Sequence, residues 1–124
     1  MLMWECGVPG EPGTLWEGGV YNVTLHFKKN YPLEPPVAVF DPVIFHPNVF
    51  EQGQVCLSIL DQSKDWRPSI SIKDILIGLQ MLLDRPNLLS PAQHLSAQML
   101  ENDPEGYKRQ ILRQAKSRTP AAAV

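Results

Sequence analysis

Cysteine is scarce in this 124-residue chain, which contains only Cys6 and Cys56. Two cysteines cannot form a disulfide framework, and their spacing matches no metal-site pattern. A reducing compartment, the nucleus or the cytoplasm, is therefore expected. No apolar run reaches the roughly 18 residues that a membrane span needs. The first ten residues lack a basic segment followed by a long apolar stretch, so no signal peptide is predicted.

A strong charge imbalance is also missing. The chain has 11 basic and 13 acidic residues and a net charge of −2, which argues against non-specific nucleic-acid binding over the whole surface. Five basic residues gather in the last stretch: Lys108, Arg109, Arg113, Lys116 and Arg118. We expect a solvated helix face and tail here, with a docking surface for an acidic partner as the alternative. No aromatic platform accompanies these charges, so specific nucleic-acid binding is not expected.

Apolar residues make up 44% of the chain, enough for the core of one domain spanning residues 1–124. In the run "VYNVTLHF", apolar side chains alternate with polar ones, which predicts a half-buried strand. "WECGVPG" and "VAVF" are further strand-like runs. "NYPLEPP" is a break, because proline is excluded from helix interiors and central strands. Short connections between the three runs predict an antiparallel meander.

The second half of the chain has a helical pattern. One predicted helix carries apolar residues on a single face: Ile72, Ile75, Leu76, Leu79, Leu82 and Leu83. Ser71, with Asp74 three residues later, predicts a capping box at the start of this helix. Ser90-Pro91 predicts a second helix that runs to about Leu100, and Asp103-Pro104 predicts a third. The fold class is therefore α+β, with a small antiparallel sheet followed by three helices.

Residues 41–70 show no strong periodicity. A compact domain rarely carries so long an irregular segment without a functional reason, and binding or catalytic groups favour loops on a rigid scaffold. Cys56 lies in this segment, eight residues after Asn48, with no histidine or carboxylate clearly placed as its base. We therefore expect the functional site here.

Several motifs occur together around this segment: "YPLEPP" before it, "HPNV" and Cys56 within it, and "DWRPSISIKDIL" near its end. With "WECGVPG" and "PGTLWEGGVY", they resemble the ubiquitin-conjugating enzyme family over residues 3 to about 118. The resemblance implies a four-stranded antiparallel sheet flanked by helices, and no cofactor or metal. It also implies that a ubiquitin-like modifier arrives from an activating enzyme as a thioester. The modifier is then transferred to a lysine of a protein substrate. Ligases are further implied partners.

Within the family, "CLSILDQSKDWRPSISIKDILIGLQ" is most similar to SUMO-conjugating members, so SUMO is the expected modifier. The alternatives are a ubiquitin carrier and a non-catalytic module that binds a ubiquitin-like protein or a ligase. Phe50 and Ala97 stand where SUMO-conjugating members usually have tyrosine, and Val37 and Val39 replace lysines. These departures alter the face expected to bind a hydrophobic-Lys-x-acidic target motif.

The resemblance makes Cys56 the thioester acceptor, since cysteine is nucleophilic even with a small thiolate fraction. Asn48 is expected to donate its amide to the developing oxyanion or to hold the active-site loop, with a simple turn residue as the alternative. His46 and Pro47 are expected to be scaffold, and Trp66 to pack over the loop of the cysteine.

Ser90 occupies a position where the family commonly has an aspartate that orients the incoming lysine and takes its proton. A hydroxyl can accept a hydrogen bond but is a poor base, so Ser90 is expected to support lysine transfer, to cap a helix, or both. Relative to the family pattern, the chain also starts three residues before Trp4, without the opening helix and first strand. We therefore expect a sheet edge with exposed apolar side chains.

Overall fold

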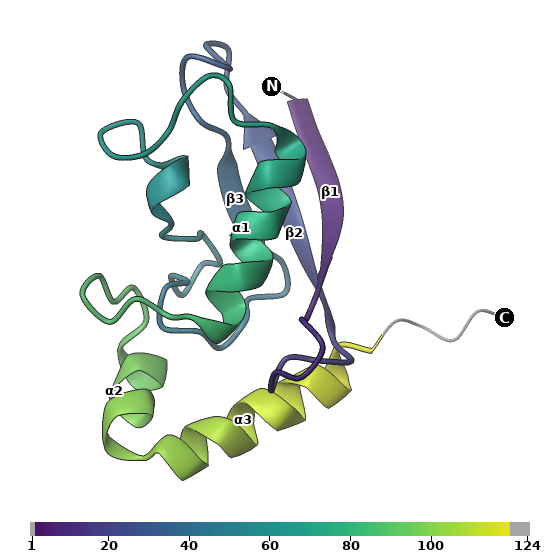
Figure 1. The fold of residues 1–124 in the computed structure, drawn as a ribbon, viewed down its shortest axis with the longest axis vertical. Coiled ribbons are helices and arrows are strands. Elements are labelled where there is room, and N and C mark those ends of the chain that lie inside the picture. The colour runs from purple at the N-terminus through teal and green to yellow at the C-terminus, as the bar shows by residue number, and fades with distance from the viewer. Residues whose placement is uncertain (1, 120–124) are drawn as a thin grey trace, which may run out of the picture.

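The computed structural model describes residues 2–119 and shows a sheet with one helix packed across it and two helices beyond one end (Figure 1). The elements follow in the order β1 (Leu2–Pro9), β2 (Val20–Phe27), β3 (Val37–Phe40), the 3-10 turn η1 (Ser58–Leu60), α1 (Ile72–Asp84), α2 (His94–Asn102) and α3 (Pro104–Ser117). This order confirms the predicted α+β class. None of the helices in this part of the chain is long and apolar enough to cross a lipid bilayer.

The strands pair antiparallel in the order β1-β2-β3, which is the predicted meander. β2 lies in the centre, and its alternation places four side chains in the core: Tyr21, Val23, Leu25 and Phe27. Within residues 2–119 the sheet has three strands, where the family resemblance implied four. An isolated bridge between Val39 and Gln54 extends the outer edge of β3 toward the irregular segment.

Helix α1 lies across the sheet (Figure 1), and its start has the predicted capping box. Ser71 Oγ accepts the Asp74 N–H, and the Asp74 carboxylate accepts the Ser71 N–H, both at 3.1 Å. Such a cap stabilises a helix by about 1 kcal/mol. The buried residues of α1 belong to the predicted face: Ile75, Leu79, Leu82 and Leu83. In its last turn the Leu82 carbonyl accepts the Arg85 N–H at 3.1 Å, and its second lone pair can accept a bond from the irregular segment.

Helix α2 begins at His94, three residues later than predicted, and its N-cap is Gln93 and not Ser90. The N–H groups of Ala92 and Gln93 both donate to the Pro47 carbonyl, at 2.7 and 3.2 Å. The Gln93 amide also donates to two carbonyls of the neighbouring segment, Ile44 O and Val49 O. Because these bonds hold Gln93 in an extended conformation, the chain coils only after it. The predicted helix start at Ser90-Pro91 was wrong, because the N–H groups of Ala92 and Gln93 form hydrogen bonds to the distant Pro47 carbonyl.

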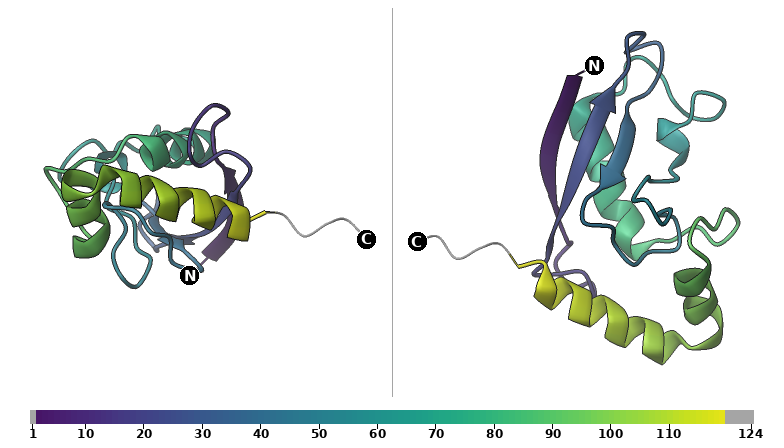
Figure 2. Two further views of the ribbon diagram at one scale, coloured as in Figure 1. Left: turned by 90° about the horizontal axis from the view of Figure 1, so that it is seen from below. Right: turned by 180° about the vertical axis from the view of Figure 1, so that it is seen from behind.

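Helix α3 begins as predicted, with Asp103 Oδ1 accepting the Gly106 N–H at 3.0 Å. Its buried side chains include Tyr107, Ile111 and Ala115, which lie four residues apart on one face. Arg118, just after the helix, donates to the carbonyls of Pro42 and Val43 at 3.1 and 2.8 Å. Its own carbonyl accepts the Val20 N–H at 2.8 Å, and the end of α3 lies beside the start of β2 (Figure 2). Arg118 therefore fastens the end of α3 to the sheet, while the other four basic residues of this stretch are exposed.

The outer edge of β1 pairs with no strand in the described part of the chain. Leu2 and Trp4 on this strand are 59% and 47% exposed, although the Trp4 ring meets Phe27 edge-on at 5.8 Å. Together with Tyr31 and Ile72 of α1, they line a cavity of about 660 Å³. The expected sheet edge with exposed apolar side chains is therefore present.

Candidate active site

A tight hairpin precedes Cys56. Val49 and Val55 form an isolated antiparallel bridge, and the Phe50 N–H donates to the Gln54 carbonyl at 2.8 Å. Gly53 makes the turn with a φ of +101°, in the left-handed region that favours glycine. Its carbonyl accepts an N–H from the end of β3 at 2.8 Å. The hairpin is thereby held against the sheet, which fixes where the following cysteine emerges.

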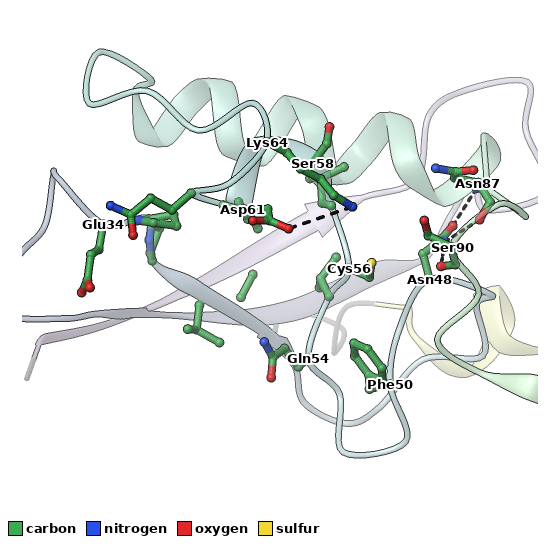
Figure 3. Close-up of a pocket in the computed structure, with 18 of the residues that line it drawn as sticks. Glu34, Asn48, Phe50, Gln54, Cys56, Ser58, Asp61, Lys64, Asn87 and Ser90 are labelled. Carbon is green, nitrogen blue, oxygen red and sulfur yellow. Dashed lines mark hydrogen bonds and ion pairs between the residues drawn. The ribbon is translucent and has the colours of Figure 1, made fainter.

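Cys56 is held from both sides by backbone hydrogen bonds. Its own N–H donates to the Asn48 carbonyl at 2.8 Å, and the N–H of Val55 donates to Ala38 of β3 at 2.9 Å. The thiol is free and half-buried. It lines a cavity of about 400 Å³ between the irregular segment and the loop after α1 (Figure 3). Cys56 is therefore positioned by backbone contacts, and its side chain lines an open cavity.

His46 is fully buried and does not act as a base for Cys56. Its Nδ1 accepts the Asn48 N–H at 2.9 Å, so the ring carries its hydrogen on Nε2, which donates to the Leu82 carbonyl at 2.7 Å. The ring also packs against Trp16, with centroids 5.6 Å apart. Burial lowers the pKa of His46 to about 4, so the ring is neutral near pH 7. His46 therefore anchors the loop to the end of α1.

The side chain of Asn48 bridges two loops. Its Nδ2 donates to the carbonyls of Asn87 and Ser90 at 2.7 and 3.0 Å, and its Oδ1 accepts the Asn87 N–H at 2.7 Å (Figure 3). The residue is 1% exposed. Both amide hydrogens are thus engaged, and the simple turn role does not apply, because the partners lie 39 and 42 residues away. Of the predicted roles, the geometry displays the loop-holding one.

Ser90 lies on the loop after α1 and lines the same cavity as Cys56. Its carbonyl accepts from Asn48, and its backbone N–H reaches the Asn87 carbonyl at 3.4 Å. Pro47, directly before Asn48, holds the next residues of this loop through its carbonyl. The HPN segment and the Ser90 loop therefore form one hydrogen-bonded unit on one side of the cysteine.

Phe50 and Trp66 have different surroundings. Phe50 is 39% exposed and lines the cavity, whereas Trp66 is only 7% exposed. The Trp66 Nε1–H is shared between the carbonyls of Pro32 and Leu33, at 3.0 and 3.2 Å. Trp66 thus pins the segment after the cysteine to the proline-rich break, while Phe50 stays accessible to a ligand. Among the departures from SUMO-conjugating members, Val37 also lines this cavity, whereas Val39 and Ala97 do not.

Sequence reasoning missed several polar residues of the cavity: Glu34, Gln54, Ser58, Asp61, Lys64 and Asn87. One local signal was available, because an aspartate two residues before a serine often forms an Asx turn. Asp61 Oδ1 does accept both the N–H and the hydroxyl of Ser63, at 2.9 and 2.7 Å. The other residues depend on which loops meet, which no local pattern reports.

The arrangement suits the transfer of an acyl group that is already activated. The nearest imidazole in the sequence is turned away into the core, and no group of three His, Cys, Asp or Glu side chains within residues 2–119 could hold a metal ion. The site contains the half-buried Cys56 thiol, the Asn48 side-chain amide that connects two loops, and a cavity lined largely by polar residues. Such a site serves thiol exchange better than hydrolysis of an unactivated bond.

Comparison with known proteins agrees with this geometry. A family model described as ubiquitin-conjugating enzyme matches residues 1–115. The chain is 47% identical to SUMO-conjugating enzyme UBC9 of Caenorhabditis elegans over 115 residues, covering 93% of this chain and 69% of the relative. It is 45% identical to Sumo-conjugating enzyme ubc9 of Dictyostelium discoideum, covering 97% and 76%. It is 46% identical to SUMO-conjugating enzyme SCE1 of Arabidopsis thaliana, covering 94% and 72%. The chain therefore belongs to the ubiquitin-conjugating enzyme family.

Proposed function

We propose that this chain is a SUMO-conjugating enzyme that carries the modifier as a thioester on Cys56 and transfers it to a substrate lysine. The observation that carries the proposal is the position of Cys56, fixed by its bond to the Asn48 carbonyl and open to the cavity. The SUMO-conjugating relatives, at 45–47% identity, support SUMO as the modifier. An activating enzyme, ligases and lysine-bearing substrates are the partners that this function requires.

Loading exchanges one thioester for another. The Cys56 thiolate attacks the carbonyl carbon of the modifier's C-terminal glycine, and the cysteine of the activating enzyme leaves as a thiolate. One carbon–sulfur bond forms and one breaks, so the step needs neither a metal nor a strong general base. A reactive free thiol requires a reducing compartment, which supports a proposed location in the nucleus and cytoplasm.

Asn48 would contribute to the second step, in which a lysine amine attacks the thioester. The bond from Nδ2 to the Ser90 carbonyl, at 3.0 Å, is longer than the one to Asn87, at 2.7 Å. We propose that the longer bond is exchanged for one to the developing oxyanion, while the bonds to Asn87 keep the amide in place. A donor of this kind lowers a reaction barrier by about 3 kcal/mol.

Ser90 would receive the incoming lysine. It faces the cavity that Cys56 lines, and it is half-buried. A serine hydroxyl can accept a hydrogen bond from an ammonium or amine and so orient it. It cannot hold the proton as a carboxylate does, so we propose that the proton passes to solvent through the open side of the cavity.

The choice of modifier is tested by loading the full chain in parallel reactions with two pairs of proteins. One reaction contains SUMO and its activating enzyme with ATP, and the other contains ubiquitin and its activating enzyme. We expect a thiol-sensitive adduct on a non-reducing gel with SUMO alone. An adduct with ubiquitin alone would overturn SUMO as the modifier while leaving the thioester chemistry intact. No adduct with either modifier would overturn the proposed enzyme.

A further inference from the structure

The segment that follows Cys56 folds back on itself and returns to the cavity. The Asp61 N–H and the Asp65 N–H both donate to the Ser58 carbonyl at 3.1 Å, and the Lys64 N–H donates to the Asp61 carbonyl at 3.0 Å. These bonds place Lys64 beside Ser58, which lies only two residues after Cys56. A lysine eight positions along the chain is thereby returned to the neighbourhood of the thiol.

This folded segment is fastened at its far end. The Trp66 N–H donates to the Asp61 carbonyl at 3.2 Å, and its buried ring is pinned by the bonds to Pro32 and Leu33. Because both ends of the turn are held, the backbone at Lys64 has little freedom to move away. The reach of the amine is then set by its own flexible side chain.

The Lys64 side chain points into the cavity that Cys56 lines (Figure 3). Its Nζ lies 4.0 Å from Asp61 Oδ2, and the two side chains are 53% and 42% exposed. An ion pair this exposed is weak because solvent screens it, so the amine can separate from the carboxylate. Hydrogen bonds from the hydroxyl and the N–H of Ser63 hold the pKa of Asp61 below its usual value. Asp61 therefore stays ionised and keeps the ammonium close to the site.

We propose that Lys64 is a self-modification site, at which the loaded enzyme transfers its modifier from Cys56 to its own lysine. This inference rests on the proposed thioester function. The ammonium first gives one proton to solvent. The amine nitrogen then attacks the thioester carbonyl, the carbon–nitrogen bond forms, and the carbon–sulfur bond breaks. The nitrogen loses a second proton to solvent and the Cys56 thiolate leaves, so the product is an isopeptide that keeps the modifier over the cavity.

Such a product would close the enzyme to further loading, because the attached modifier occupies the space above the free thiol. Transfer to a substrate lysine would compete with it, so the modified form should accumulate when the loaded enzyme meets no substrate. Modification of Lys64 would therefore inactivate enzyme molecules that remain loaded without a substrate.

Lys28 provides a matched control, because its side chain lines the same cavity. Val55 bonds to Ala38, which pairs with Leu25 of β2. Lys28 lies three residues beyond Leu25 and two strands away from Val55. At about 3.3 Å per residue and about 4.8 Å between strands, this separation is roughly 14 Å. Lys28 directly follows β2, whereas Lys64 lies on the turn that is bonded back to Ser58, so we expect acylation at Lys64 and not at Lys28.

The test uses the full chain loaded with SUMO, after which ATP is removed and no substrate is added. We expect a slow adduct that resists thiol reductants, maps to Lys64 in a tryptic digest, and forms at a rate independent of dilution. Lys64→Arg keeps the positive charge but cannot be acylated, so it should lower the rate at least tenfold. Lys28→Arg should leave the adduct in place. All rates are normalised to the amount of thioester formed.

The outcomes separate this inference from the function on which it rests. A thioester that forms normally and yields no resistant adduct, an adduct that maps to another lysine, or an equal rate in Lys64→Arg would overturn self-modification alone. A rate that rises with enzyme concentration would also overturn it, because transfer would then occur between molecules. Failure to form any thioester would overturn both the inference and the proposed function.

Discussion

At the scale of single residues, Asn48 faces a conflict between two uses of the same side chain. Its two amide hydrogens bond Asn87 and Ser90 in the resting site, and one of them would serve the oxyanion during transfer. Because the Asn48 side chain is buried, water cannot form hydrogen bonds in its place with the backbone groups that it now contacts. Substitution of Asn48 should therefore lower both the free energy of unfolding and the rate of lysine transfer, and the two quantities can be measured separately.

Asn48→Ala should lower the free energy of unfolding by about 2 kcal/mol, because the Ser90 carbonyl and the Asn87 N–H lose their partner and the Asn87 carbonyl keeps only a long bond to the Ser90 N–H. It should also slow lysine transfer from the loaded enzyme on the order of 100-fold. Urea unfolding and single-turnover discharge measure these effects. Asn30→Ala, at an exposed position, is the control and should change neither. Normal discharge from a destabilised Asn48→Ala would leave the residue with the loop-holding role alone.

His46 links the stability of the site to pH. Its pKa is about 4 in the fold against 6.5 in the unfolded chain, so the unfolded chain binds more protons between these values. The stabilising contribution is complete above pH 6.5 and declines as the pH falls toward 4. A difference of 2.5 pKa units corresponds to about 3 kcal/mol at 1.36 kcal/mol per unit.

Urea unfolding at pH 7 and pH 5 should show this loss. In His46→Gln the pH dependence should be weaker, because the titrating ring is gone. His26→Gln, on the opposite face of β2, should keep the full dependence. If His46→Gln and the unaltered chain depend on pH equally, the buried neutral imidazole is not the cause.

Ser90 tests how the incoming lysine is handled. Ser90→Asp places a carboxylate on the cavity wall, where it can orient the lysine and accept its proton. Transfer to a substrate lysine should rise several-fold, while loading of Cys56 changes little, because loading involves no amine. Rates of the two steps are measured in separate single-turnover reactions. An equal effect on both steps would refute a role of this position in proton handling.

At the scale of elements, the hairpin before Cys56 depends on Gly53. A Cβ at this glycine would collide with the Phe40 carbonyl, and its φ of +101° is already unfavourable for other residues. Gly13 also has a positive φ, of +81°, but a Cβ there would meet no atom within 4 Å. The two glycines therefore separate backbone strain from collision.

Gly13→Ala should lower the free energy of unfolding by about 1 kcal/mol, from strain alone. Gly53→Ala should cost more than about 2 kcal/mol, because the hairpin must also move away from β3. Thermal and urea unfolding measure both. Gly53→Ala should further reduce loading of Cys56, whereas Gly13→Ala should not. Equal costs at the two positions would show that the hairpin does not need its close approach to the sheet.

The elements also show which sequence patterns predict structure. The starts of α1 and α3 were predictable, because Ser71 and Asp103 bond N–H groups within their own helices. The start of α2 was not, because the donors of Ala92 and Gln93 bond Pro47, about 45 residues away. Local patterns predict local bonds, and they fail where a distant carbonyl competes for the same donor.

At the scale of the whole molecule, the site also contains some residues that local sequence patterns predict and others that only the fold brings together. The motifs predicted that Cys56 and Asn48 would lie together, and the bond between their backbones joins them. They did not predict that Lys64 and Asp61 would return to the cavity, since this depends on how the segment after the cysteine turns back. The proximity of Cys56 and Asn48 could thus be predicted from sequence, whereas most of the surrounding cavity required the fold.

Of the two thiols in the chain, only Cys56 is proposed to carry the modifier. Both Cys6 and Cys56 are free and half-buried, so exposure alone does not distinguish them. Cys6 lies on β1, paired with Val23 in the sheet, whereas Cys56 follows the hairpin and opens onto the cavity. Cys6 lines a separate cavity with Asn22 and Asp41, so we propose Cys56 as the acceptor because it follows the HPN segment and its N–H is bonded to Asn48.

The most direct measurement loads three chains with SUMO, its activating enzyme and ATP, and compares non-reducing with reducing gels. The unaltered chain and Cys6→Ala should each form one adduct that disappears on reduction. Cys56→Ala should form none, while unfolding at the same temperature as Cys6→Ala within a few degrees. An adduct that persists in Cys56→Ala, or one that is lost in Cys6→Ala, would contradict the assignment of Cys56 as the acceptor.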